Sequence, residues 1–165
     1  MATSFITYGH LEELSYYYLM KPNLDIRQLT IEGISPIEFD NQHVTEGEYV
    51  VDVAEYYGGD NFKTADKIKY YQLKYTTVAK GEPFPPSKLR NTLEGFSERY
   101  SRLVEVVGKE IAQAKLEFIF VSNRPIHVGF HESITQIASG NPTSQTNQKK
   151  IEDFTSLKGS ELSDF

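Results

Sequence analysis

Three polar residues of types that can bind metals or phosphates lie in two segments that are otherwise rich in strand-forming residues. Asp52 lies within "YVVDVAEYY", and Gln72 and Lys74 lie two residues apart within "YYQLKYTT". Two interpretations are open. One is a solvent-exposed sheet edge on which Asp52 and Lys74 form an ordinary cross-strand ion pair. The other is a site for metal-dependent cleavage of nucleic acid, where hard oxygen ligands hold Mg²⁺ and a lysine adds positive charge.

The chain around these residues can bring them together on one face of a sheet. The two strand segments are separated by "GGDNFKTAD", a glycine-rich stretch able to turn the chain. An antiparallel pair centred on this turn places Val53 near Tyr71 and Asp52 near Gln72. Strand alternation then predicts the acid, the amide and the ammonium on one face. The opposite face receives four apolar residues: Val51, Val53, Tyr71 and Leu73.

Periodicity predicts the other elements of an α/β domain. "TYGHLEELSYYYLM" has the apolar spacing of a helix, and "RQLTIEGI" alternates like a strand. Apolar residues from Leu89 to Val107 recur at intervals of four and three, which predicts a long amphipathic helix. "LEFIFVSN" is typical of a central strand buried on both faces, parallel to the strand before the helix. "HESITQIA" predicts a further helix. The expected fold is a three-layer α/β/α core with a mixed sheet, an antiparallel meander plus a parallel strand.

Length and charge restrict the classes of function. A chain of 165 residues without cysteine fits one domain and excludes disulfides, thiolate zinc sites and a cysteine nucleophile. Since no apolar run approaches membrane-spanning length and no secretion signal is visible, we expect a cytoplasmic protein. The net charge of −6 is unevenly distributed: residues 1–62 carry eleven acidic and two basic side chains, whereas residues 63–102 carry four and nine. The acidic part could hold a cation and the basic part phosphates, or both could be solvated faces.

The last 25 residues differ in composition from the rest. "SGNPTSQTNQKK" is polar and of low complexity, and "LKGSELSDF" resembles a helix that has only begun. We therefore expect a domain over residues 1–140. Residues 141–165 are predicted to be a polar linker and the start of a connection to a C-terminal domain beyond this sequence.

The predicted order of elements and the Asp…Gln-x-Lys pattern resemble the PD-(D/E)xK, or restriction-endonuclease-like, superfamily. Within it, "YGHLEEL", "VVDVAEYY", "YYQLKYTT", "EFIFVSNRPI" and "LKGSELSDF" are most similar to nuclease domains at the head of bacterial anti-phage proteins. These are the CBASS-associated endonucleases and the antiviral STAND-type NTPases. One departure is Gln72, because many members of the superfamily have glutamate there, and glutamine lacks its negative charge.

The resemblance implies a role for each polar residue. Asp52 is the expected principal ligand of Mg²⁺ or Mn²⁺, Gln72 a second ligand, and Glu32 a further one. Lys74 is expected to orient or deprotonate the attacking water, or to stabilise the transition state. Glu12 on the first helix is a further catalytic candidate. For Glu12 and Glu32, a solvated surface position is the alternative interpretation.

The implied substrate is DNA, and the implied role is that of an effector in anti-phage defence. Four cations on or near the long helix are candidates for DNA binding: Lys88, Arg90, Arg99 and Arg102. Arg124, just after a buried strand, either meets a phosphate or caps the strand end. The expected active form is an oligomer, assembled through a C-terminal sensor or NTPase domain. The rival functions are a catalytically inactive domain that binds nucleic acid or a partner on the same scaffold, and a small interaction module.

Overall fold

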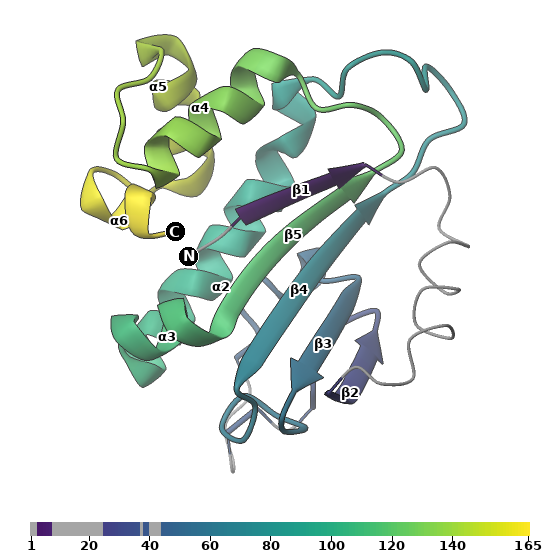
Figure 1. Ribbon diagram of the computed structural model, residues 1–165, viewed down its shortest axis with the longest axis vertical. Coiled ribbons are helices and arrows are strands. Elements are labelled where there is room, and N and C mark those ends of the chain that lie inside the picture. The colour runs from purple at the N-terminus through teal and green to yellow at the C-terminus, as the bar shows by residue number, and fades with distance from the viewer. Residues whose placement is uncertain (1–2, 8–24, 37, 40–43) are drawn as a thin grey trace.

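The five strands within the described residues form one mixed sheet in the order β1-β5-β4-β3-β2 (Figure 1). The computed structural model describes residues 3–7, 25–36, 38–39 and 44–165. The strands are β1 (Thr3–Thr7), β2 (Ile26–Ile31), β3 (Val53–Tyr57), β4 (Lys67–Lys74) and β5 (Leu116–Ser122). β1, β5 and β4 are parallel, whereas β4, β3 and β2 form an antiparallel meander. The predicted α/β class and mixed sheet are therefore confirmed. β1 has no counterpart in the predicted order, because five residues are too few to show a period.

The register of the central hairpin agrees with the prediction from its glycine-rich turn. Val53 pairs with Tyr71 and Tyr57 with Lys67, as predicted. The regular ladder does not extend to Asp52, whose N–H donates to the Tyr71 carbonyl instead of pairing with Gln72. However, β3 begins only at Val53. The preceding residues form a 3-10 turn, η1 (Glu48–Val50), instead of the predicted strand.

The described helices are η2 (Pro86–Leu89), α2 (Arg90–Val107), α3 (Lys109–Lys115), α4 (Val128–Ala138), α5 (Gln145–Thr155) and α6 (Ser160–Asp164). The long helix α2 has the predicted apolar stripe, and its buried Leu93, Phe96 and Leu103 pack against the sheet. It ends at Val107 because Gly108, with φ of 87°, turns the chain. Figure 1 shows α4, α5 and α6 gathered around α2, away from the β2–β3 end of the sheet.

Both faces of the sheet contain buried apolar residues. Ala54, Tyr70 and Phe118 belong to the main core, which includes α2. The opposite face has a second, smaller cluster: Val53, Tyr71, Ile119 and Val121, with Leu73 against it. Two buried faces are compatible with a three-layer core. The helix predicted from "TYGHLEELSYYYLM" lies almost entirely outside the described residues.

The predicted side of Val51 is wrong. Val51 lies in the main core with the α2 side chains, not with Val53 and Tyr71. The strict alternation used for the prediction applies only within a regular strand, and the chain is irregular between η1 and β3.

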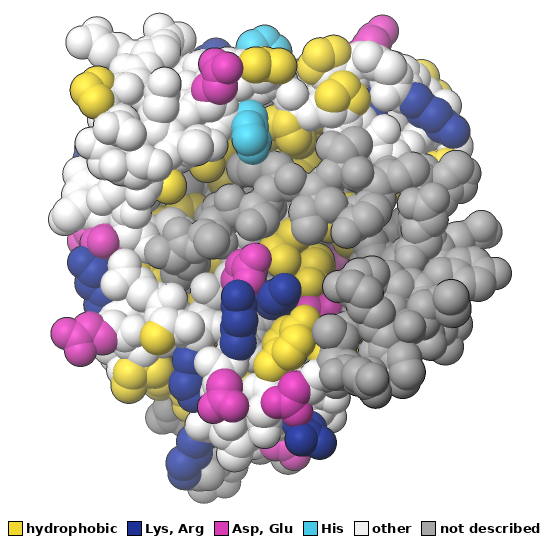
Figure 2. All heavy atoms as spheres, viewed as in Figure 1, with side chains coloured by type: hydrophobic (Ala, Val, Ile, Leu, Met, Phe, Trp, Pro, Cys, Tyr) yellow, Lys and Arg dark blue, Asp and Glu magenta, His cyan; other side chains and the backbone are white. Residues whose placement is uncertain are grey.

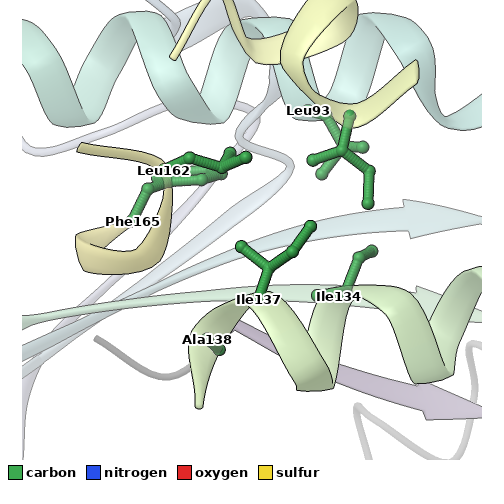
Figure 3. Close-up of a pocket in the computed structure, with 7 residues that line it drawn as sticks. Leu93, Ile134, Ile137, Ala138, Leu162 and Phe165 are labelled. Carbon is green, nitrogen blue, oxygen red and sulfur yellow. The ribbon is translucent and has the colours of Figure 1, made fainter. Parts of the chain in front are cut away.

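The predicted polar linker is also wrong, because residues 145–165 fold onto the domain. α5 packs against α2, and Ile151, Leu162 and Phe165 are buried in the main core. Figure 3 shows Leu162 and Phe165 near Leu93 and Ile137 around an apolar cavity of about 30 Å³. Helix α5 was not predicted because residues 139–150 are polar, and the apolar residues of the helix begin only at Ile151.

Candidate active site

The turn that leads to Asp52 is fixed by a close approach between two glycines. Gly47, with φ of 68°, lies against Gly95 of α2, and a Cβ atom at Gly47 would be 2.0 Å from the Gly95 carbonyl oxygen. A Cβ atom at Gly95 would lie 2.6 Å from both methyl groups of Val50. Both positions therefore require glycine, which lets η1 rest directly on α2. This contact sets where the chain enters β3.

Asp52 lies immediately before β3, and its backbone is hydrogen-bonded to β4 and to the residue that follows β2. Its N–H donates to the Tyr71 carbonyl at 2.8 Å, and its carbonyl accepts from the Glu32 N–H at 2.7 Å. The Oδ2 atom of its half-buried carboxylate accepts a hydrogen bond from the Leu73 N–H at 2.6 Å. A hydrogen bond to an ionised acceptor is stronger than a neutral one. The carboxylate is thus held at the backbone between Gln72 and Lys74.

Gln72 is buried, with 4% of its surface exposed. Its Oε1 accepts a hydrogen bond from the hydroxyl of Thr92, which is itself buried in the first turn of α2. This bond fixes the direction of the amide and satisfies one of the two lone pairs of its oxygen. Thr92 was not among the predicted site residues. Its position within the apolar stripe, three residues after Leu89 and four before Phe96, is the signal that identifies it.

Lys74 ends β4, and its side chain is exposed. In the parallel ladder it lies opposite Ser122, the last residue of β5. Among the residues that the structure describes, Lys74 has no ion-pair partner, so the cross-strand pair with Asp52 is not formed. Alternation along β4 directs Gln72 and Lys74 to the same face of the sheet, but their environments differ. The Gln72 amide is packed under α2, and the Lys74 ammonium is exposed to solvent.

Two further acids, Glu32 and Glu12, were predicted to belong to the site. Glu32 is exposed, follows β2 with φ of 57°, and is joined to Asp52 by the backbone hydrogen bond given above. Glu12 lies outside the described residues. Within the described ranges, no three side chains from His, Asp and Glu come together in a group that could hold a metal ion.

Two of the four predicted DNA-binding cations are exposed and lie within four residues of Thr92, the hydrogen-bond partner of Gln72. Lys88 and Arg90 lie in η2 and at the start of α2, four and two residues before Thr92. Arg102 is ten residues beyond Thr92, about 15 Å along the helix. It is paired with Glu46 at 3.5 Å and Glu105 at 2.6 Å. On the face shown in Figure 2, Lys and Arg side chains are interspersed with Asp and Glu side chains.

The assignment of Arg99 to the DNA-binding surface is wrong, because Arg99 is fully buried. Its guanidinium forms an ion pair with the equally buried Glu38 and donates to the Val44 carbonyl at 2.8 Å. It also donates to the Tyr70 hydroxyl, 3.2 Å away. Burial lowers the pKa of Arg99, but the neighbouring Tyr70 and Glu38 raise it, and the net shift is upward. Arg99 therefore ties the segment around Glu38 to α2 and β4 as a permanent charge.

No model of a known protein family matches the sequence, and no curated protein matches it. No helix in the described part of the chain is long and apolar enough to cross a membrane. The site is therefore characterised by its own chemistry: a fixed carboxylate, a buried amide and an exposed ammonium at one end of the sheet.

Proposed function

We propose that this domain is a metal-dependent deoxyribonuclease that hydrolyses phosphodiester bonds at the end of β4. One observation carries the proposal: the Asp52 carboxylate is bound to the Leu73 N–H, between Gln72 and Lys74. The acid is thereby held against the part of the β4 backbone that carries the amide and the lysine. The sequence resemblance to PD-(D/E)xK nucleases supports the same chemistry.

The oxygen atoms at this place suit Mg²⁺, a hard cation that commonly binds one or two carboxylates and retains several waters. Oδ2 of Asp52 is bound to the backbone, but within the described residues Oδ1 accepts no hydrogen bond, so it can bind a cation. The second lone pair of Gln72 Oε1 is the next candidate, and the exposed carboxylate of Glu32 is the third. When bound, Mg²⁺ would supply an activated water and positive charge at the phosphate.

The residues of the chain would then divide the remaining tasks. Asp52 is held in position by the backbone of β4, one residue before Lys74. The Lys74 ammonium, which has three hydrogen-bond donors, contacts a non-bridging phosphate oxygen and neutralises charge that develops there. Lys88 and Arg90 bind neighbouring phosphates and orient the strand. Thr92 acts as a positioning residue, because it sets the direction of the Gln72 amide.

The proposal is tested by nicking of supercoiled plasmid with the purified 165-residue chain. We expect cleavage with Mg²⁺ or Mn²⁺ and none with EDTA. Lys74→Met should abolish cleavage, whereas Lys150→Met, an exposed lysine on α5, should not. Undiminished cleavage by folded Lys74→Met would contradict the proposed role of the lysine.

The alternative is a catalytically inactive domain that binds nucleic acid or a partner on the same scaffold. It is favoured by Gln72, which lacks a negative charge and is buried under Thr92. This alternative predicts salt-sensitive DNA binding without cleavage in any divalent metal. The plasmid experiment separates the two functions.

A role as an effector in bacterial anti-phage defence is supported by the sequence resemblance alone. We propose that the effector is activated by assembly, since joining several weak DNA-binding sites raises their effective concentration. Fusion to an inducible oligomeriser should then raise cleavage per active site. Equal activity per site in the monomer and the oligomer would contradict activation by assembly.

A further inference from the structure

The loop between β4 and α2 presents apolar side chains to solvent directly beside the candidate site. It begins at Tyr75, the residue after Lys74, and reaches away from the sheet before returning to η2 (Figure 1). Tyr75 is 41% exposed and Val78 is 73% exposed. Single exposed apolar residues are common on protein surfaces. These two, however, lie one and four residues from the proposed catalytic lysine.

The base of this loop is held by the two residues that follow β5. Asn123 accepts from the Thr76 N–H at 3.1 Å and donates to the Thr76 carbonyl at 2.7 Å. Arg124 donates to the carbonyls of Glu82 and Pro83, both at 2.9 Å. Its guanidinium also lies over the ring of Phe84, 5.5 Å from the centroid. Of the two interpretations of Arg124, the structure therefore supports a backbone-fixing role rather than a phosphate contact.

The tip of the loop is fixed by its own hydrogen bonds. The Thr76 hydroxyl accepts from the Val78 N–H at 3.1 Å and donates to the Val78 carbonyl at 3.0 Å. Ala79 follows with φ of 57°, and the Glu82 N–H donates to its carbonyl at 3.0 Å. Because the loop is already ordered, a partner would bind it without the entropic cost of ordering a flexible segment.

The charge around the loop is predominantly positive. Lys80 lies over the ring of Tyr75, with Nζ 5.8 Å from the centroid. Between residues 74 and 90 the chain carries four cations, Lys74, Lys80, Lys88 and Arg90, against a single acid, Glu82. An exposed aromatic ring among cations suits a strand with a phosphate backbone and bases whose faces can stack.

We infer that Tyr75 stacks on a nucleobase next to the phosphate bound at Lys74, so that the site takes unpaired DNA in preference to duplex. This inference rests on the proposed nuclease function and specifies its substrate class. In a duplex the faces of a base are covered by its neighbours, and exposing one costs a few kcal/mol. In a single strand the face is available, and a stacked ring contributes roughly 1–3 kcal/mol per base. Val78 then packs against the adjacent sugar or base.

The test measures binding in EDTA, where no cleavage occurs, to a single-stranded oligonucleotide containing 2-aminopurine and to the duplex of the same sequence. Stacking on an aromatic ring quenches the fluorescence of this base. We expect tighter binding to the single strand, with quenching. Tyr75→Leu should remove the quenching and weaken single-strand binding about five- to a hundredfold. Tyr75→Phe should restore both, and duplex binding should change little in either variant.

A second pair of variants does not depend on Tyr75. Val78→Asp places a negative charge at the loop tip and should weaken single-strand binding. The matched control Ile111→Asp, an exposed residue on α3, should not. Equal single-strand binding by wild type and Tyr75→Leu, or tighter binding to duplex, would overturn the inference even if plasmid cleavage is observed. Tyr75-dependent quenching without cleavage in any metal would overturn the nuclease proposal instead, and absence of DNA binding would overturn both.

Discussion

Asp52 and Leu73 are joined by a hydrogen bond of 2.6 Å from the backbone N–H of Leu73 to the carboxylate of Asp52. The Asp52 side chain thereby supplies an acceptor for the Leu73 N–H. In a regular β-ladder this acceptor would be a backbone carbonyl of the neighbouring strand. Asp52 is thus both a structural group and the proposed metal ligand. Substitutions can separate the two roles.

Asp52→Ala should lower the free energy of unfolding by about 1–2 kcal/mol, because it leaves the Leu73 N–H without its acceptor. Asp52→Asn retains an acceptor oxygen and should be close to wild type in stability. Urea unfolding monitored by circular dichroism measures both variants. If Asp52→Ala were as stable as Asp52→Asn, the hydrogen bond would make no net contribution.

Gln72→Glu tests whether residue 72 contacts the metal. A glutamate there keeps an acceptor for Thr92 but buries a negative charge, which is costly unless a cation is bound. We expect a lower melting temperature than wild type in EDTA and a larger rise on addition of Mg²⁺. Cleavage should be retained, because the charged oxygen has a similar reach. Identical responses of wild type, Gln72→Glu and Gln72→Ala to Mg²⁺ would exclude direct ligation.

Arg99→Met should destabilise the domain by about 3–5 kcal/mol, because it removes the buried cation that pairs with the Glu38 carboxylate. Arg102→Met breaks surface ion pairs and should cost less than about 1 kcal/mol. The double variant Glu38→Gln with Arg99→Met should recover part of the loss. Equilibrium unfolding in urea gives all three values, and similar losses for Arg99→Met and Arg102→Met would contradict the buried network.

Lys88→Ala and Arg90→Ala should each weaken DNA binding and reduce the slope of log K against log salt by about 1. Arg102→Ala should change this slope less, because Arg102 is already paired with Glu46 and Glu105. Binding measured over a series of salt concentrations tests the difference. Equal effects at all three positions would place the DNA along the whole of α2 instead of at its start.

The register of the central hairpin and the long helix α2 could be predicted, because each depends on a pattern within a short stretch of sequence. The glycine-rich turn fixed the register of Val53 with Tyr71, and the apolar spacing from Leu89 to Val107 predicted α2. Val51 was placed on the wrong face because alternation fails where η1 replaces strand. α5 was missed because its apolar residues begin only at Ile151.

The environment of the site could not be derived from sequence. Arg99 was expected on the surface because its partner Glu38 is 61 residues away along the chain, and no local pattern connects them. The hydrogen bond from Thr92 to Gln72 likewise joins residues from two different elements. Such contacts depend on how strands and helices pack, whereas periodicity reports only the face on which each residue lies.

The most direct test of the central claim is single-turnover cleavage of DNA by wild type, Asp52→Asn and the matched control Asp153→Asn, an exposed acid on α5. Asp52→Asn keeps an acceptor oxygen for the Leu73 N–H and removes the negative charge offered to a cation. With Mg²⁺ in excess, the account predicts cleavage by wild type and the control, and only background cleavage by Asp52→Asn at an unchanged melting temperature. Equal rates for all three proteins, or no cleavage by the wild type in any divalent metal, would contradict it.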